Sequence, residues 1–333
     1  MNAISPKHAN VALFIPFNGC PHKCSFCDQR SITGKTCQPS PEDVRAAIET
    51  ALDSLKENSI NSEIAFFGGS FTAIDRAYMV SLLEAAAPYI DRFRGIRIST
   101  RPDCIDPEIL ALLKGYGVTS IELGAQSMSD EVLSANDRGH TADDAVKASG
   151  LIRESGFELG LQMMTGLYKS SDELDVFTAE RFIELRPETV RIYPTIVMRG
   201  TQLGELYQAG VYAPQELEPA VGLCARLVTL FEQNGVRVIR VGLHDTDTLR
   251  RDMLAGPYHP AFRELCESRI MLDKAVSLLS ARGRGEYTLL VSPKSRSKMT
   301  GNKKSNIAAL KELGYEVTIA EDDNLGERDI VIN

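Results

Sequence analysis

The sequence predicts an α/β protein, in which a curved parallel sheet of about six strands is covered by helices and followed by a small C-terminal α/β appendage. Short apolar runs rich in β-branched and aromatic residues alternate with longer segments of helical periodicity, which is the pattern of repeated βα units. The chain has 333 residues, of which 43% are hydrophobic. That is enough for one large barrel of roughly 200 to 250 residues and an appendage.

The expected strands are short apolar runs in the first two thirds of the chain. They are Val11–Phe17, Glu63–Phe67, Ile96–Thr100, Ser120–Leu123, Glu158–Met163 and Thr189–Tyr193. The helices expected between them are Pro41–Leu55, Ala77–Ala87, Pro107–Tyr116, Ala142–Glu154 and Ser171–Glu184. Ser40 and Pro41 mark a helix start, because Pro suits the first turn and the acids that follow lie near the positive end of the helix dipole. Functional residues should gather at the carboxyl ends of such strands.

The pattern changes near residue 244, so we assign residues 1–244 to a core barrel and residues 245–333 to an accessory domain. A helix over Pro260–Leu279 leads into a small α/β unit. This unit has a strand at Tyr287–Val291, a polar loop, a helix at Asn306–Leu313 and a strand at Tyr315–Ala320. We expect the appendage to close the mouth of the barrel against water and oxygen.

Composition bears on location and partners. The formal net charge is −8, which gives no global basic surface for a nucleic acid, so any RNA contact must come from a local patch. No apolar run approaches the roughly 18 residues that a membrane helix needs, and the N-terminus lacks the basic and apolar regions of a signal peptide. Seven cysteines suit a reducing compartment. We therefore expect a cytoplasmic protein without a membrane partner.

Three of the cysteines, Cys20, Cys24 and Cys27, stand together as C-x3-C-x2-C directly after the first expected strand. Three thiolates this close can hold three irons of a cubane cluster and leave the fourth iron open to a ligand. Zinc is an alternative, but it needs four ligands, and His22 inside the loop is too close to its neighbours to complete the set comfortably. A disulfide cannot pair all three thiols. The other cysteines are scattered singly, at Cys37, Cys104, Cys224 and Cys266.

This cysteine motif after a first strand resembles that of the radical S-adenosylmethionine (SAM) superfamily. The resemblance implies a partial TIM-type (β/α) barrel and a [4Fe-4S] cluster whose unique iron is chelated by the amino and carboxylate groups of SAM. Phe26 matches the aromatic residue common before the third cysteine, and simple packing is the alternative for it. An external one-electron reductant such as flavodoxin or ferredoxin would reduce the cluster. SAM would then yield a 5'-deoxyadenosyl radical that takes a hydrogen atom from the substrate.

Polar motifs follow the later strands, and the resemblance assigns them to SAM. The residues are Gly68, Gly69, Ser70, Thr100, Gln126, Arg138 and Gln162. The two glycines look like the motif that holds the methionine amine, with Ser70 where the family often has Glu. A matching Gln and Arg contact SAM in the branch that includes the anaerobic coproporphyrinogen oxidases and the Elongator catalytic subunit. Around Thr100 the alternative is structural, with Asp106 capping a helix and Arg101 in a surface salt bridge.

From about Asn10 to Leu243, several motifs resemble, in order, those of the radical SAM half of the Elongator catalytic subunit. They include Thr100-Arg-Pro-Asp103, Asn136 to Thr141 and Val190 to Thr201. Two departures are expected. The first two cysteines should lie farther apart in that subunit, and fewer than a hundred residues follow the barrel here, without a glycine-rich acetyl-CoA loop. We thus expect a short bacterial relative without the acetyltransferase domain, to which carboxymethyl chemistry on tRNA uridine does not transfer directly.

A basic loop in the appendage is the best candidate site for an anionic partner. Between Ser292 and Lys304 the loop carries no acid and five basic residues, Lys294, Arg296, Lys298, Lys303 and Lys304. Together with the Elongator-like barrel, this loop predicts modification of a tRNA base, with phosphate bound by the loop. The alternatives are a solvated surface paired with the acidic C-terminus, a small-molecule or peptide substrate, and a non-catalytic iron–sulfur or zinc module.

Overall fold

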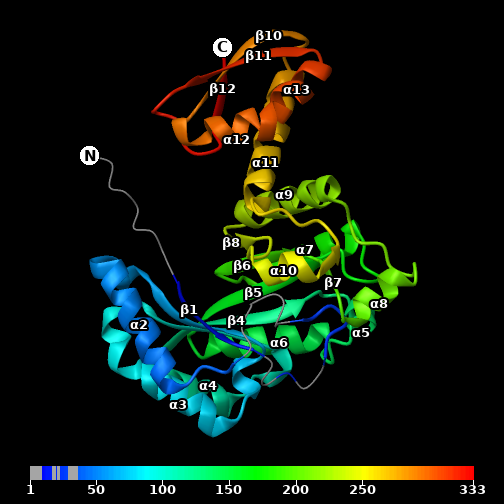
Figure 1. The fold of residues 1–333 in the computed structure, drawn as a ribbon. Coiled ribbons are helices and arrows are strands. Elements are labelled where there is room, and N and C mark those ends of the chain that lie inside the picture. The colour runs from blue at the N-terminus through cyan, green and yellow to red at the C-terminus, as the bar shows by residue number, and fades with distance from the viewer. Residues whose placement is uncertain (1–9, 17–19, 21–22, 29–36) are drawn as a thin grey trace.

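A computed structural model describes residues 10–16, 20, 23–28 and 37–333 (Figure 1). At its centre is one sheet of seven strands in the order β1-β2-β3-β4-β5-β6-β8, and each neighbouring pair is parallel. The strands are β1 (Asn10–Ile15), β2 (Glu63–Gly68), β3 (Gly95–Thr100), β4 (Val118–Gln126), β5 (Glu158–Thr165), β6 (Thr189–Pro194) and β8 (Arg237–Val241). The strands follow one another in chain order and the sheet curls into a half-barrel, which confirms the partial TIM-type α/β fold.

The sequence predicts about six strands, and the structure adds a seventh, β8. The residues Arg237-Val-Ile-Arg-Val241 mix cationic and apolar side chains, so they lack the continuous apolar run of a strand that is buried on both faces. β8 pairs with β6 alone and ends the sheet, which explains its lower burial. At the other end of the sheet, the strand expected to reach Phe17 is described only as far as residue 16.

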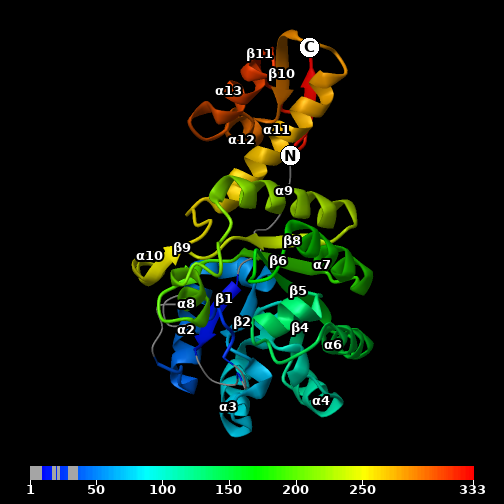
Figure 2. The ribbon, with the colours of Figure 1, turned by 90° about the vertical axis from the view of Figure 1, so that its right-hand side faces the viewer.

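Helices cover the outer face of the half-barrel (Figure 2). They are α2 (Pro41–Leu55), α3 (Arg76–Ala86), α4 (Pro107–Gly115), α6 (Ala142–Glu154), α7 (Asp172–Leu185) and α9 (Leu217–Gln233). The start of α2 is confirmed, because the side chains of Ser40 and Asp43 form a reciprocal capping box. Side chains from helices and strands share one core, in which Val44, Ile98 and Phe182 are fully enclosed. Within the described part of the chain, no helix has the length and apolar character needed to cross a bilayer.

Shorter elements follow the carboxyl ends of β4, β6 and β8. They are α5 (Asp130–Ala135), β7 (Val197–Met198), α8 (Gln202–Gln208), α10 (Asp247–Asp252) and β9 (Met253–Ala255). β7 and β9 pair in antiparallel fashion. These segments build up the end of the half-barrel at which the strands finish.

A long helix, α11 (Phe262–Ser280), connects the half-barrel to a separate C-terminal lobe (Figures 1 and 2). The lobe contains β10 (Gly285–Val291), α12 (Arg296–Thr300), α13 (Ser305–Glu312), β11 (Tyr315–Glu321) and β12 (Ile330–Ile332). Cys266 of α11 belongs to the barrel core, whereas Met271 and Ala275 belong to the core of the lobe. One helix therefore serves two cores, and the domain boundary expected at residue 244 stays a prediction.

The lobe departs from expectation in one segment. The region expected to be a polar loop contains the short helix α12, between two single-turn 3-10 helices. Every residue of α12 except Met299 is polar, and Met299 is fully buried in the lobe core. A single apolar side chain is too weak a periodic signal to reveal a helix.

Candidate active site

A cavity of about 650 Å³ lies at the carboxyl ends of the strands. The residues assigned to the cluster and to SAM that line it are Cys20, Cys24, Phe26, Cys27, Gly68, Gly69, Thr100, Gln126, Arg138 and Gln162. Ser70 does not line the cavity. Its buried hydroxyl lies 2.7 Å from that of Thr100 and so supports a lining residue from behind. His22, the possible zinc ligand, lies outside the described residues.

The segment around Cys24 is fastened to the barrel by Asn136, the residue that follows α5. Ser25 N donates to the Asn136 carbonyl at 3.1 Å, and Ser25 Oγ donates to Asn136 Oδ1 at 2.9 Å. Asn136 is fully buried, and its Nδ2 donates to the carbonyls of Val132 and Tyr168. Asn136 therefore positions the cysteine segment without lining the cavity. Its only signal in the sequence is its place in the Asn136–Thr141 motif.

The three thiols lie in different environments. Cys24 is buried, Cys27 is half-buried and Cys20 is exposed. Burial, and then the neighbouring thiols of Cys24 and Cys20, raise the pKa of Cys27 to about 12. Arg138 Nη1 donates to Cys24 Sγ at 2.9 Å, so a cation faces this sulfur.

The arrangement of these thiols bears on the kind of metal site. Among the described residues, no three His, Cys, Asp or Glu side chains converge closely enough to hold a single metal ion. In a cubane cluster each thiolate binds a different iron, so three thiols that share a cavity without converging on one point suit a cluster better than a lone zinc ion.

Three buried polar atoms at this cavity make no hydrogen bond to any described residue. They are Gln126 Oε1, Arg138 Nε and Arg101 Nη1. An unpaired buried polar group costs about 1–3 kcal/mol, so such atoms usually mark a missing partner. One acceptor and two donors beside three thiols match the amino and carboxylate groups that SAM presents to a protein. The residues present therefore fit SAM bound next to a cluster.

The structural alternative for the segment around Thr100 is a helix cap by Asp106 and a surface salt bridge by Arg101, and the structure tests both parts. Asp106 caps α4 by accepting a hydrogen bond from Ile109 N at 2.8 Å, as that alternative predicts. Arg101 is not in a surface salt bridge, because it is only 3% exposed and pairs with Asp103 at 2.8 Å while lining the cavity. The sequence does not reveal Arg101 as a site residue, since an arginine after a strand is usually solvated.

Two strand ends at the cavity have special backbone conformations. Gly68 has a φ of +127°, and a Cβ there would lie 2.4 Å from the carbonyl oxygen of Ile15, so only glycine permits this approach of β2 to β1. Gln126 ends β4 with a φ of +69°, a left-handed conformation that costs a non-glycine residue about 1–2 kcal/mol. A register shift between Leu123 and Gln126 accompanies it. Strain of this kind concentrates at functional sites.

His140 lies behind the site. Burial, and then the positive charges of Arg138 and Arg101, lower the pKa of His140 to about 4. The ring is therefore neutral at pH 7, and its Nε2 lies 3.3 Å from the carbonyl of Ala125, next to Gln126. This contact makes His140 a support for the end of β4.

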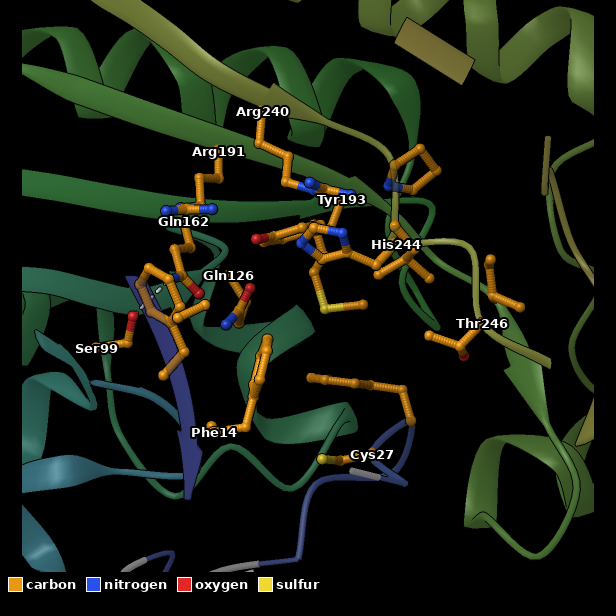
Figure 3. A pocket seen from close by; sticks show the side chains of 18 of the residues that line it. Phe14, Cys27, Ser99, Gln126, Gln162, Arg191, Tyr193, Arg240, His244 and Thr246 are labelled. Atoms are coloured by element: carbon orange, nitrogen blue, oxygen red, sulfur yellow. Dashed lines mark hydrogen bonds between the residues drawn. The ribbon is translucent and has the colours of Figure 1, made fainter. Parts of the chain in front are cut away.

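A second cavity, of about 720 Å³, continues from the first along the inner face of the sheet (Figure 3). The residues common to both cavities are Phe26, Cys27, Gly68, Ser99, Gln126 and Gln162. Aromatic and basic side chains line the rest of the second cavity, namely Phe14, Phe67, Arg191, Tyr193, Arg240 and His244. The sequence does not reveal this set, because the six residues come from four strands and a loop.

Apart from Asp245 and Thr246 at its start, the appendage does not contribute to these walls as expected. No described residue beyond Thr246 lines either cavity, so the lobe does not close the mouth of the half-barrel. The long helix α11 holds the lobe away from the strand ends instead (Figure 2).

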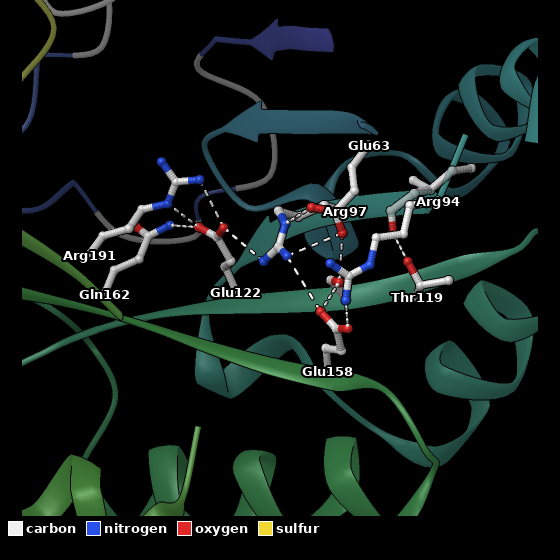
Figure 4. A network of polar contacts seen from close by, with 10 residues as sticks. Glu63, Arg94, Arg97, Thr119, Glu122, Glu158, Gln162 and Arg191 are labelled. Carbon is white, nitrogen blue, oxygen red and sulfur yellow. Dashed lines mark hydrogen bonds and ion pairs between the residues drawn. The ribbon is translucent and has the colours of Figure 1, made fainter. Parts of the chain in front are cut away.

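A network of buried charged and polar side chains connects the strands β2 to β6 (Figure 4). Glu122 accepts hydrogen bonds from Arg191 Nε at 2.7 Å, from Arg97 Nη1 at 3.1 Å and from Gln162 Nε2 at 2.9 Å. Arg97 also donates to Glu63 at 2.8 Å. Removing one partner from such a buried set is strongly destabilising. The network therefore fixes Gln162 and Arg191 in the wall of the second cavity.

The five basic residues of the lobe lie outside both cavities. Two of them have acidic partners: Arg296 pairs with Glu321 at 3.1 Å, and Lys298 approaches Glu267 and Glu327 at 3.8 and 3.9 Å. The other three, Lys294, Lys303 and Lys304, are exposed and have no ion-pair partner among the described residues.

Comparison with known proteins assigns this chain to a family. Residues 14–178 match the family model described as the radical SAM superfamily, and residues 187–271 match the model of the radical SAM C-terminal domain. The chain belongs to the radical SAM superfamily. It is an enzyme, and radical SAM enzymes bind a [4Fe-4S] cluster and SAM. They also require an external reductant.

The similar proteins include enzymes whose names refer to tRNA modification or to the Elongator complex. The chain is 31% identical over 258 residues to the tRNA uridine(34) acetyltransferase of Methanocaldococcus jannaschii, covering 64% of this chain and 47% of the relative. It is 30% identical over 263 residues to Elongator complex protein 3 of Mus musculus, covering 76% of this chain and 43% of the relative. The chain thus spans about half the length of these curated relatives.

A solved structure shows the same fold. The archaeal Methanocaldococcus infernus Elp3 matches with a TM-score of 0.64 and 23% identity, covering 85% of this chain and 65% of the other. The resemblance to the radical SAM part of the Elongator catalytic subunit is therefore confirmed.

Proposed function

We propose that this radical SAM enzyme reductively cleaves SAM at a [4Fe-4S] cluster held by Cys20, Cys24 and Cys27, and that it modifies a tRNA base. One observation carries the first part: the three thiols share a single cavity with the unpaired atoms of Gln126 and Arg138. When bound there, the cluster and SAM supply a 5'-deoxyadenosyl radical that removes a hydrogen atom from the substrate.

The chain's own residues orient these groups. Arg138 donates to Cys24 Sγ, which offsets negative charge on that sulfur, and its Nε remains for a carboxylate. Gln126 Oε1 is an acceptor suited to an amine. Phe26 lines both cavities, and its ring lies 6.0 Å from the Arg138 guanidinium. The apolar surface of Phe26 limits the access of water to the place where the two cavities meet, between the SAM site and the proposed substrate site.

The choice of tRNA rests on two observations. The relatives named above carry tRNA or Elongator in their names, and their similarity covers this half-barrel. The lobe adds three exposed lysines without acidic partners among the described residues, Lys294, Lys303 and Lys304. Such lysines suit phosphate contacts. Flavodoxin or ferredoxin is the reductant we propose.

The test uses anaerobically reconstituted protein, SAM, a reductant and total tRNA. We expect slow formation of 5'-deoxyadenosine without tRNA, faster formation with tRNA, and a changed nucleoside in the digested tRNA. A small-molecule or peptide substrate would instead give a rate that tRNA leaves unchanged. Absence of SAM cleavage in fully reconstituted, reduced protein would contradict the first part of the proposal.

A further inference from the structure

The second cavity holds a cation that SAM cleavage does not use. Arg240 projects from β8 into this cavity, and its Nε donates to the Gly242 carbonyl at 3.0 Å (Figure 3). Among the described residues, no other group accepts a hydrogen bond from Arg240 and no carboxylate lies within ion-pair distance of it. Its two terminal nitrogens are therefore left for a ligand.

Two carboxylates of the described residues near this cavity, Glu122 and Asp245, are already engaged. Glu122 accepts two hydrogen bonds from Arg191, at 2.7 and 2.9 Å. Asp245 is held by Arg250 at 2.7 Å. Neither is free to neutralise Arg240.

The surroundings of Arg240 are unfavourable to its own charge. Burial, together with the positive charges of Arg191 and Arg263, lowers the pKa of Arg240. A half-buried cation without a counter-ion is costly, and an incoming anion would remove that cost.

Two further groups lie beside Arg240. Partial burial, followed by the charges of Arg240 and Arg191, lowers the pKa of His244 to about 4, so its ring is neutral at pH 7 and can donate one hydrogen bond. The hydroxyl of Tyr193 is a second donor. Figure 3 shows Arg240, Tyr193 and His244 on one wall of the cavity, with Cys27 on the opposite side.

Aromatic rings also line this cavity. Phe14 and Phe67 lie with their ring centroids 6.2 Å apart and their planes tilted by 48°. Rings of this kind provide a stacking surface for a planar group such as a nucleobase. A cavity of about 720 Å³ is within the range of sites that enclose a ligand of nucleotide size.

We propose that Arg240, assisted by His244 and Tyr193, binds an oxyanion carried by the substrate, at the end of the second cavity opposite the cluster cysteines. The source of this oxyanion rests on the proposed function. On an RNA substrate, one base enters the cavity and lies against Phe14 and Phe67, and the oxyanion is the phosphate next to that base. On a free metabolite or a peptide it would be a carboxylate. The subsite would hold the substrate at one end and present its other end to the radical.

The test measures binding to anaerobically reconstituted full-length protein with SAM present, by calorimetry. The probes are uridine, uridine 5'-monophosphate, inorganic phosphate and acetate. We expect the monophosphate to bind about ten-fold or more tightly than uridine, because hydrogen bonds to a charged group are among the strongest available. Arg240→Gln should remove most of this gain, and Arg240→Lys should retain part of it, since lysine keeps the charge without the forked geometry. Arg181→Gln is the matched control, because the side chain of Arg181 is 40% exposed on α7 and lies outside both cavities.

The outcomes separate this inference from the proposed function. If the monophosphate binds no better than uridine and acetate does not bind, or if the gain survives in Arg240→Gln, the oxyanion subsite is wrong. If acetate alone binds in an Arg240-dependent manner, the subsite stands with a carboxylate substrate, and an RNA phosphate as the source of the oxyanion is wrong. If tRNA accelerates 5'-deoxyadenosine formation equally in wild type and Arg240→Gln, the tRNA proposal stands and the subsite does not.

Discussion

Gln126 combines a left-handed backbone with a buried side-chain oxygen that no described residue satisfies. Each feature alone is unfavourable, by about 1–2 kcal/mol for the backbone and about 1–3 kcal/mol for the unpaired oxygen. A bound ligand explains both, because the strained turn aims the amide into the cavity and the ligand supplies the missing donor. Residues that reduce stability without a ligand are typical of binding sites.

Replacing Gln126 by glycine separates these two effects. Gln126→Gly should weaken SAM binding by roughly ten-fold or more, since a ligand donor then loses its acceptor. The free energy of unfolding should stay the same or rise, because glycine adopts a positive φ without strain. Equilibrium binding of SAM and chemical denaturation measure the two quantities. Unchanged SAM affinity would show that Gln126 does not contact SAM.

The cluster ligands give a second prediction at this scale. Cys24→Ala should lose most of its iron and its visible absorption after reconstitution, because one iron of the cubane loses its thiolate. Cys224→Ala should keep both, since Cys224 is buried in the barrel core away from the cavity. Equal iron in the two variants would refute the assignment, and stoichiometric zinc in the wild-type protein would favour the zinc alternative.

The sequence could predict some of these residues but not others. Cys20, Cys24 and Cys27 are neighbours along the chain, so their spacing alone indicates a cluster. Arg101 and Arg240 each look like ordinary surface arginines in the sequence. Only the curl of the sheet brings them to the cavities, and only their hydrogen-bond partners in the fold show which of their nitrogens are unpaired.

Among the elements, helix α7 contains a buried acid in its first turn. Asp175 is 2% exposed and accepts hydrogen bonds from Gly166 N at 2.8 Å and Ser170 Oγ at 2.6 Å. Burial raises the pKa of Asp175 to about 6. The folded protein therefore binds this proton more tightly than the unfolded chain, whose Asp has a pKa of about 3.9.

This difference fixes the sign of a pH effect. The contribution of Asp175 to stability is most favourable below about pH 4 and is lost as the pH rises through about 6. Asp175→Asn should thus raise the free energy of unfolding at pH 7.5, by up to about 3 kcal/mol, and flatten its change between pH 4 and 6. Denaturant titrations at several pH values test this, with the exposed Asp143→Asn of α6 as control. A variant that follows the wild-type pH profile would contradict it.

The elements themselves were largely predictable, with instructive gaps. The strands β1 to β6 contain short apolar runs rich in β-branched or aromatic residues between segments of helical periodicity, so these strands follow from the sequence. β8 ends the sheet and carries Arg237 and Arg240, so its composition resembles that of a surface segment. The same arginine that hides the strand in the sequence is the one that lines the second cavity.

At the scale of the whole molecule, the lobe is a separate unit carried at the end of α11 (Figure 1). Arg328 fastens it to the half-barrel region by donating to Glu267 of α11 at 2.7 and 2.8 Å and to Glu232 at the end of α9 at 3.3 Å. The lobe thus has a defined attachment while its lysines remain outside both cavities. This arrangement suits contact with a large partner of which only one part enters the half-barrel.

Salt dependence tests whether RNA is that partner. Lys294→Glu, Lys303→Glu and Lys304→Glu combined should weaken tRNA binding and reduce the log–log salt slope by about 0.7 for each single-strand phosphate that these lysines no longer neutralise. SAM cleavage without tRNA should be unaffected. The matched control is the combination of Lys56→Glu, Lys147→Glu and Lys169→Glu, which changes the charge equally at exposed positions of the half-barrel. Equal slopes in the two triple variants would exclude a role for the lobe lysines.

The shared helix α11 acts as a rotational coupling between the half-barrel and the lobe. Its first turns are fixed by the barrel core through Cys266, and its later turns are fixed by the lobe core through Met271. Each residue of an α-helix adds about 100° of rotation and 1.5 Å of rise. One residue inserted between the two anchors would therefore rotate the lobe, with its exposed lysines, by about 100° around the helix axis. Four inserted residues would return the lobe to within about 40° of its original orientation and move it about 6 Å farther from the half-barrel. The number of residues between the two anchors in α11 thus sets the orientation of the lobe relative to the half-barrel.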